Sequence, residues 1–294
     1  MKTLNKKYSV AAFVDILGYK DLIQNESQER EIELFNDLKN TIDTALAATV
    51  KSTKELLIFL ENKDGNSEKI SERLRVKQFS DNIYFSFDYD EQNDLDLYLG
   101  IYIISNISAL YQRLMLAKGY FVRGGIAIGL NMVDKNFIFS TALIKAVETE
   151  KETIYPRITM HSELKDKFIS AIQNPFQDIT KGLYIQDWTE HIFLNPFNYT
   201  SRNIKTLGSL PQEELEQIEQ AITTTQKRIV NKMNKNFANL YDDKEFNSVA
   251  RGHINKKLRK FKSKNQSVYE KYLWTRNFLN WVDKGQADLT FKYL

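Results

Sequence analysis

Two aspartates are the residues of this sequence best placed to do chemistry. Asp15 stands near the end of the apolar run YSVAAFVDIL, and Asp81 lies in the triplet Ser80-Asp81-Asn82 between two short β-rich segments. A turn beside the end of a neighbouring strand would bring both carboxylates to one edge of a sheet. Two hard oxygen ligands there suit one or two Mg²⁺ or Mn²⁺ ions that substrate phosphates complete. The alternative is structural, because Asp15 can cap the following helix and Asp81 can form an Asx-type turn.

Two further segments could bind phosphate. The residues Ile16-Leu17-Gly18-Tyr19 predict a strand-to-helix turn whose backbone N–H groups and helix dipole could hold phosphate oxygens. The triplet Arg123-Gly124-Gly125 opens another apolar run, where an arginine could bind phosphate bidentately. The alternative for this triplet is an ion pair between Arg123 and a carboxylate, with the glycines needed for close packing.

An alternation of strands and helices must position these residues. Apolar spacing predicts helices over residues 32–46, 95–117 and 141–151, and strands over 8–17, 74–79, 83–87, 120–129, 154–159, 182–186 and 192–194. Residues 61–72 and 131–139 are expected to be irregular. This order predicts an α+β fold with a ferredoxin-like split β-α-β core. In that topology the first strand and the strand after Asp81 are neighbours at the centre of the sheet.

The last third of the chain has a different pattern. From Leu210 onward only helical spacing is visible, with one apolar stripe at Leu215, Ile218, Ile222, Ile229 and Met233 and another at Val268, Tyr272, Leu279 and Val282. We expect two parts: a catalytic domain over residues 1–205, and a helical C-terminal appendix over residues 206–294 that packs on it.

Composition excludes several classes of protein. With 294 residues and 42% hydrophobic residues the chain can bury a core, and its net charge of +3 does not by itself indicate a nucleic-acid or membrane-surface protein. The absence of cysteine excludes disulfides, a thiol nucleophile and iron–sulfur or zinc-ribbon sites. The apolar run 97–116 contains Arg113 and several polar residues, so a buried helix is expected rather than a membrane span. We expect a cytoplasmic protein.

Five segments in order carry a family resemblance. They are FVDILGYKDLI, RVKQFSDNIYFSF, YFVRGGIAIG, FSTALIKAVETE and YPRI. Over roughly residues 8–195 the chain resembles the class III nucleotidyl cyclase homology domain, most closely the pyrimidine cyclases of the bacterial antiphage system called Pycsar. The resemblance implies conversion of UTP or CTP to a 3′,5′-cyclic mononucleotide and pyrophosphate. It also implies a homodimer with sites between the subunits, and a separate effector protein that reads the product.

The resemblance also implies roles for individual residues. Asp15 and Asp81 would hold two divalent ions, Mn²⁺ or Mg²⁺, with the carbonyl oxygen of Ile16 as a further ligand. Arg123 and the turn backbone would meet the triphosphate while the ribose 3′-hydroxyl attacks the α-phosphorus. The turn residues are Leu17, Gly18 and Tyr19.

Two departures from purine cyclases stand on the helix expected at 141–151. Purine-specific members place there an asparagine and an arginine for the transition state, and this chain has Ile144 and Glu148 instead. Lys145 or Arg157 could supply the missing positive charge.

Two other positions concern the base. The acidic residue that reads a purine corresponds to Phe137, and its basic partner position corresponds to Arg75. Arginine has hydrogen-bond donors only, which suits the carbonyl acceptors of uracil or cytosine. The prediction is a pyrimidine substrate, with UTP and CTP both open.

Two rival functions remain at this point. A catalytically inactive cyclase-fold sensor or binding protein would explain Ile144 and Glu148, although both aspartates are retained. A nucleic-acid-binding protein could use the basic run Lys256–Lys264. A solvated helix face is favoured for that run, because the acidic runs 26–33 and 88–96 offset it. No stable nucleic-acid or membrane partner is expected.

Overall fold

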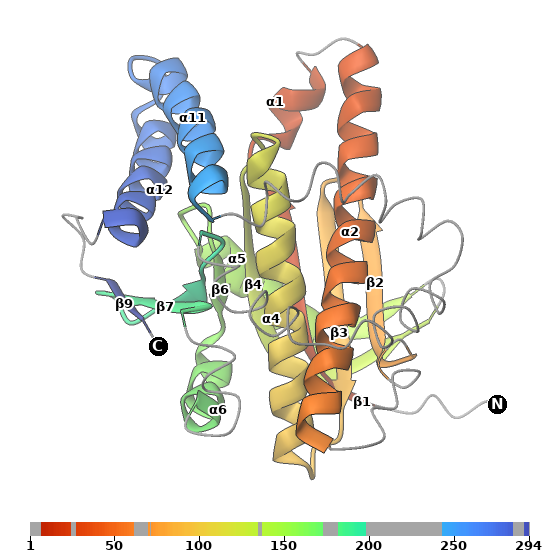
Figure 1. Ribbon diagram of the computed structural model, residues 1–294. Coiled ribbons are helices and arrows are strands. Elements are labelled where there is room, and N and C mark those ends of the chain that lie inside the picture. Colours follow the sequence, from red (N-terminus) through yellow and green to blue (C-terminus); the bar gives the residue numbers. More distant parts are fainter. Residues whose placement is uncertain are drawn as a thin grey trace, which may run out of the picture.

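One sheet organises the protein. The computed structural model describes residues 7–24, 28–61, 70, 72–134, 137–172, 182–197, 243–284 and 291–293. Within them a nine-stranded sheet has the order β2-β3-β1-β4-β6-β8-β7-β9, and β5 pairs with β4 outside this path (Figure 1). Its strands are β1 (Lys7–Ile16), β2 (Leu74–Phe79), β3 (Asn82–Tyr89), β4 (Val122–Val133), β5 (Ile138–Ser140), β6 (Ile158–Met160), β7 (Tyr184–Asp187), β8 (Ile192–Leu194) and β9 (Phe291–Tyr293).

The first four long strands form the expected core. Strand β1 pairs antiparallel with β3 on one side and with β4 on the other, and β2 pairs with β3. The order β4-β1-β3-β2 is the ferredoxin-like arrangement, so the predicted α+β fold is confirmed. The first strand and the strand after Asp81 are neighbours, as the split β-α-β topology requires.

Helices cover the two faces of this core unequally. They are α1 (Tyr19–Gln24), α2 (Gln28–Glu61), α4 (Asp94–Ala117), α5 (Thr141–Glu152), α6 (Ser162–Ile172), α11 (Asp243–Phe261) and α12 (Gln266–Lys284). Helix α4 and, beside it, α2 bury one face of the core strands in the main hydrophobic cluster (Figure 1). Helix α5 packs on β4 and β1, in a smaller cluster that contains Ala11 and Ala142. Because side chains alternate along β1, Val14 faces α4 and Asp15 faces the side of α5.

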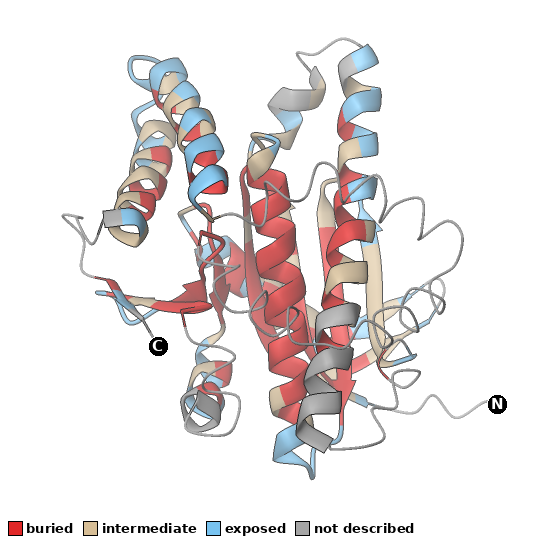
Figure 2. Ribbon diagram, in the orientation of Figure 1, coloured by how far each residue is buried: buried red, intermediate tan, exposed pale blue. Residues whose placement is uncertain are grey.

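The apolar run 97–116 is the buried helix expected from the sequence. Almost all of α4 from Leu97 to Leu116 is buried, and Figure 2 shows it as the most continuously buried helix of the protein. No helix in the described ranges has the length and apolar character needed to cross a membrane.

The C-terminal residues pack on the far end of the sheet. Helices α11 and α12 lie against each other and form a second apolar cluster with β7, β8 and β9. The stripe of Val268, Tyr272, Leu279 and Val282 is confirmed, since all four lie in or against this cluster. The expectation of helices alone is wrong, because the terminal strand β9 pairs with β7. The earlier stripe at Leu215–Met233 lies outside the described residues.

Three boundaries differ from the sequence-based expectation. Strand β4 continues to Val133 and β5 pairs back on it, where an irregular segment was expected. Helix α2 is longer than residues 32–46, although its end at Glu61 coincides with the expected polar segment, most of which lies outside the described residues. Strand β6 begins only at Ile158. Pro156 has no N–H to contribute to a ladder, and the N–H of Arg157 donates to the carbonyl of Tyr155 at 2.8 Å, which folds the chain back on itself.

Candidate active site

Asp15 and Arg123 face each other across two central strands. They are directly opposite in the antiparallel register of β1 and β4. Arg123 Nε lies 3.6 Å from Asp15 Oδ2, and the two side chains are 24% and 20% exposed. The ion-pair alternative for Arg123 is therefore realised, but with a carboxylate of the candidate site itself.

The second aspartate reaches the same place from the β2–β3 turn. Ile83 pairs with Val14 as the last rung between β3 and β1, so the turn lies beside the end of β1. Asp81 is close enough to Asp15 for their carboxyl groups to share a hydrogen bond, and it also accepts one from Asn82 Nδ2 at 3.2 Å. The structure thus brings Asp15 and Asp81 together.

Glu150 is a third acid of the site that the sequence analysis did not identify. It stands in the last turn of α5, only 5% exposed, and forms an ion pair with Arg123 Nε. Two signals could have revealed it. Glu150 shares the buried face of α5 with Ala142 and Ala146 at spacings of four residues, and an acid in the last turn of a helix is opposed by the helix dipole.

Gly125 permits this contact. A Cβ atom on Gly125 would lie 2.1 Å from the carbonyl oxygen of Ala146, so α5 rests directly on the backbone of β4. Any larger residue would push the helix outward and move Glu150 away from Arg123. Close packing explains this glycine, as the alternative for the Arg123-Gly124-Gly125 triplet anticipated.

Burial and the crowding of acids together raise the pKa of Asp15 to about 7. Burial is the largest cause, and the negative charges of Glu150 and Asp81 add to it, while Arg123 acts in the opposite direction. Burial also raises the pKa of Glu150, which Arg123 partly counteracts. One arginine among three carboxylates leaves a local excess of negative charge.

The site residues fit a divalent cation. Asp15 and Asp81 offer hard oxygen donors, and added positive charge would relieve their mutual repulsion. The side chain of Ile16 is buried in the main core, so Ile16 could contribute only its carbonyl oxygen. In α4, the hydroxyl group of Tyr111 is buried without a hydrogen-bond partner, and its pKa is raised by burial and by both aspartates. Across the described ranges, no three Asp, Glu or His side chains converge as a complete ligand set. Backbone, water and phosphate oxygens would have to complete the shell.

The turn after β1 has the expected form. Gly18 adopts a φ of +76°, in the left-handed region that favours glycine, and α1 begins at the next residue, Tyr19. The N–H of Leu17 donates to the carbonyl of Phe121 at 2.8 Å, which ties the turn to the residue before β4. The turn thus lies next to both Asp15 and the start of the Arg123 strand.

Arg75 is not next to the aspartates. It is opposite Ser86 on β3, which places it about 13 Å from the level of Asp15 along the strands. Its guanidinium lies 3.7 Å from the carboxylate of Asp88 and donates to the carbonyl of Glu72. The side chain is 33% exposed.

The other positions weighed from the sequence are also engaged elsewhere or exposed. Phe137, Ile144 and Glu148 are exposed, and Lys145 pairs with Glu163 of α6. Arg157 is buried in an ion pair with Asp187, so it is not available as the missing transition-state charge. The basic run Lys256–Lys264 belongs to the end of α11 and the turn after it, with most of its charged residues exposed, as expected for a solvated helix face.

The raised pKa of Asp15 predicts an unusual dependence of stability on pH. The folded-state pKa of about 7 lies above the ordinary value of 3.8, so folding favours the protonated carboxyl. Stability in the absence of divalent ions should be full below pH 3.8 and decline as the pH rises through 7. At pH 8 the Asp15→Asn variant should unfold at a Tm about 2–8 °C higher than the parent, because a charge penalty of about 1–2 kcal/mol is removed. This free-energy penalty is smaller than the whole pKa change would imply, because solvent reaches the side chain of Asp15 and screens its charge.

Thermal unfolding in EDTA at pH 4.5 and pH 8 measures this effect. The matched control is Asp94→Asn, which removes an exposed carboxylate from the start of α4. Equal Tm values for the parent and Asp15→Asn at pH 8 would contradict the prediction, as would a gain of the same size at both pH values.

Comparisons with known proteins find similar solved structures but no match by sequence. No protein-family model matches the chain, and no curated protein matches its sequence. Among solved structures, it is similar to the monomeric guanylyl cyclase domain of the RhoGC fusion protein from the aquatic fungus Blastocladiella emersonii, at a TM-score of 0.38 and 11% identity over 64% of this chain and 95% of that one. A bacterial light-regulated adenylyl cyclase matches at a TM-score of 0.35 and 14% identity, over 70% of this chain and 58% of that one. The guanylyl cyclase Cya2 matches at a TM-score of 0.30 and 10% identity, over 55% of this chain and 79% of that one.

Proposed function

We propose that this protein is a metal-dependent nucleotidyl cyclase that converts UTP or CTP to a 3′,5′-cyclic mononucleotide and pyrophosphate. The observation that supports this proposal most is the meeting of Asp15 and Asp81 beside Arg123. Two adjacent carboxylates with a neighbouring guanidinium can bind divalent cations and a polyphosphate together.

The chemistry is an in-line displacement at the α-phosphorus. The ribose 3′-oxygen forms a bond to this phosphorus, the bond to the β-phosphate oxygen breaks, and the hydroxyl proton is released to a base or to water. Bound divalent ions would acidify the hydroxyl and neutralise phosphate charge. The role of Asp15 and Asp81 is to hold these charges in place, and that of the turn at Gly18 is to present backbone N–H groups to the phosphates.

Arg123 would exchange partners when the triphosphate binds. Its guanidinium now lies between the carboxylates of Asp15 and Glu150. Once cations neutralise Asp15, the guanidinium can turn donors toward phosphate while Glu150 still holds it. Glu150 is a positioning residue in this scheme, since it acts on the substrate only through Arg123.

Base selection is assigned to Arg75. The base and the α-phosphate are at opposite ends of a nucleotide, so a residue that reads the base is expected at a distance from the metal ligands. The half-buried position of Arg75 on β2 meets this condition, and its donors suit pyrimidine carbonyl groups.

The Arg75→Ala variant tests this assignment. Loss of the guanidinium should leave base acceptors unpaired and reduce selectivity for UTP or CTP over ATP about tenfold to a hundredfold. Thermal stability should change little, because the ion pair with Asp88 is partly exposed. Steady-state kinetics with all four triphosphates measures the selectivity. Unchanged discrimination would show that the base is read elsewhere, and Phe137 would be the next position to replace.

A homodimer is part of the proposal. Apolar side chains on β5 and α5 are left exposed, namely Phe139, at 71%, and Ile144, at 58%. A two-fold contact would cover such residues and allow each subunit to complete the site of the other. Asp15 and Arg123 of one subunit lie in the same site, so mixing inactive Asp15→Asn and Arg123→Ala subunits should leave one lesion in each site of a heterodimer and restore no activity. A fully active monomer in sedimentation at micromolar concentration would refute the shared site.

Incubation of the purified protein with each of the four nucleoside triphosphates and Mn²⁺, followed by chromatography, tests the function itself. A cyclic pyrimidine nucleotide and equimolar pyrophosphate are expected. We further propose that a separate effector protein reads this product in antiphage defence. Binding of a nucleotide without any turnover would instead favour the inactive sensor, which the exposed Ile144 and Glu148 on α5 support.

A further inference from the structure

Arg157 occupies an unusual position for a charged residue. It follows Pro156 directly before β6, and its side chain is 7% exposed. The guanidinium pairs with Asp187 at the end of β7, which is 1% exposed. Burial alone would raise the pKa of Asp187, yet hydrogen bonds from Thr189 and Arg157 hold it below the ordinary value. Both partners therefore stay charged in the interior, where a pair costs much and stabilises little by itself.

The C-terminal module, defined as α11, α12 and β9, encloses this ion pair. The Arg157 guanidinium carbon lies 5.4 Å from the ring centre of Trp274 on α12 and 4.9 Å from that of Phe193 on β8. Trp274 also stacks on Tyr155, with ring centres 4.8 Å apart and planes within 7°. Asp187 is the register partner of Phe291 on β9, whose ring packs 6.0 Å from that of Trp274. The segment 155–157 is thus held from the side of the module.

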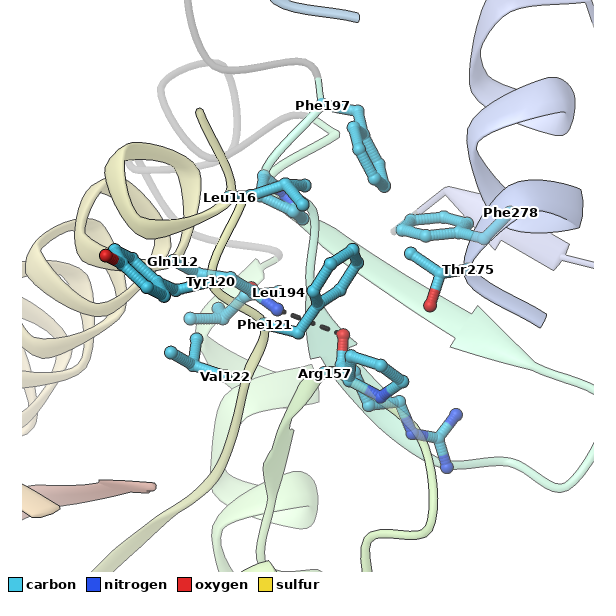
Figure 3. A pocket seen from close by; sticks show the side chains of 12 residues that line it. Gln112, Leu116, Tyr120, Phe121, Val122, Arg157, Leu194, Phe197, Thr275 and Phe278 are labelled. Atoms are coloured by element: carbon cyan, nitrogen blue, oxygen red, sulfur yellow. Dashed lines mark hydrogen bonds between the residues drawn. The ribbon is translucent and has the colours of Figure 1, made fainter. Parts of the chain in front are cut away.

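The same segment is held from the side of the core. Gln112 Nε2 of α4 donates to the carbonyl of Pro156 at 3.2 Å. Figure 3 shows Gln112 facing this segment across a small pocket, with Thr275 and Phe278 of α12 on the opposite side. The pocket has room for about one water molecule. Little free space remains in which the segment could shift.

The backbone of Arg157 continues this chain of contacts to the site. Its carbonyl oxygen accepts a hydrogen bond from the N–H of Gly124 at 3.0 Å, next to the first rung of the parallel β4–β6 ladder, where Gly124 is opposite Ile158. Gly124 directly follows Arg123. A shift of Arg157 would therefore be transmitted through one hydrogen bond to the residue beside the guanidinium that pairs with Asp15 and Glu150.

We infer that Arg157 is a positioning residue through which the C-terminal module holds Arg123 in place for the triphosphate. This inference rests on the proposed function only for the identity of the substrate, because the mechanical link can be measured without turnover. The module, which packs on the sheet through its own residues Trp274 and Phe291, keeps the start of β4 fixed. A partner or ligand that displaced the module would loosen it and weaken substrate binding.

Hydrogen exchange tests the link directly. In the full-length protein, Trp274→Leu should remove the ring that covers Tyr155 and Arg157 but keep an apolar side chain. Amides of residues 122–126 are expected to exchange about tenfold faster in this variant. Arg157→Gln should have the same effect, and Arg157→Lys, which can still pair with Asp187, should restore most of the protection. The matched control is Leu97→Ala, a buried position near the start of α4, whose other end contacts the module, and this variant should leave these amides unchanged at conditions of equal global stability.

Kinetics supplies a second readout. The positioning role predicts that Trp274→Leu raises KM for the triphosphate about threefold to tenfold and changes kcat less. Unchanged exchange of residues 122–126 in Trp274→Leu would overturn the inference, as would an equal acceleration in Leu97→Ala. If Arg157→Gln does not fold, Trp274→Leu alone decides. If no variant and no parent protein turns over any nucleotide, the proposed function fails while the exchange result still decides the link.

Discussion

Asp15→Asn and Asp81→Asn are each expected to lower kcat by about a thousandfold or more while the chain remains folded. Each substitution keeps the shape of the side chain and removes the charge that a divalent cation requires. The two carboxylates act on the same ions, so the double variant should be little worse than either single one. Product formation from UTP and CTP with Mn²⁺, together with circular dichroism of each variant, measures both halves of the expectation.

Asp94→Asn is the matched control, since it removes a carboxylate that lies outside the cluster at the start of α4. It should keep activity within about twofold of the parent. Activity of Asp15→Asn or Asp81→Asn within a few-fold of the parent would refute the metal assignment. Asp15→Asn is expected to be more stable than the parent at pH 8. A loss of activity that is caused by unfolding would therefore be easy to recognise.

Arg113→Met is expected to lower the free energy of unfolding by about 2–4 kcal/mol. Arg113 is 1% exposed on α4 and pairs with Asp243 of α11 at 3.0 Å. It also donates to the carbonyl of Pro196 at 2.8 Å and lies 3.8 Å from the ring centre of Phe246. Methionine fills a similar volume but leaves the carbonyl and the carboxylate without this donor, and it gives up the cation–π contact.

The effect should be concentrated in the C-terminal module. All three tryptophans of the chain, Trp188, Trp274 and Trp281, lie in or next to its aromatic cluster, so their fluorescence reports on this region. Urea unfolding followed by fluorescence should shift more than unfolding followed by circular dichroism. Arg251→Met is the control, because the ion pair of Arg251 with Asp283 is partly exposed and should contribute about 1 kcal/mol or less. Equal losses in the two variants would contradict the anchoring role of Arg113.

Short-range patterns in the sequence predicted much of the central sheet. The unbroken apolar run of β1 requires burial on both faces, and the observed strand has α4 on one face and α5 on the other. The alternation of strands and helices implied that β1 and β3 are neighbours, and this adjacency alone predicts that Asp15 and Asp81 approach each other. Both inferences depend on periodicity and connection rules, which act over short stretches of chain.

The positions of the site residues other than the two aspartates depend on tertiary packing. Glu150 joins Arg123 because α5 rests on Gly125, and the rotation and height of a helix on a sheet are set by contacts between distant residues. Arg75 stands six residues before Asp81, a spacing that puts both residues on one face of a strand, but the hairpin register puts Arg75 opposite Ser86. Counting six residues gives the face of the sheet correctly and cannot give the distance, because the turn reverses the chain.

The sequence by itself therefore determined the α+β class, the order of the central strands and the pairing of Asp15 with Asp81, because hydrophobic periodicity and topology rules specify these features locally. Only the tertiary structure decided which charged side chains are buried and which residues pair with them. Nothing in the sequence indicates the partners of Arg113 and Arg157, yet each is buried against aromatic side chains and a carboxylate from a distant element. A charge can be buried only where the whole fold supplies its partners, and such partners come together only when elements far apart in the chain have packed.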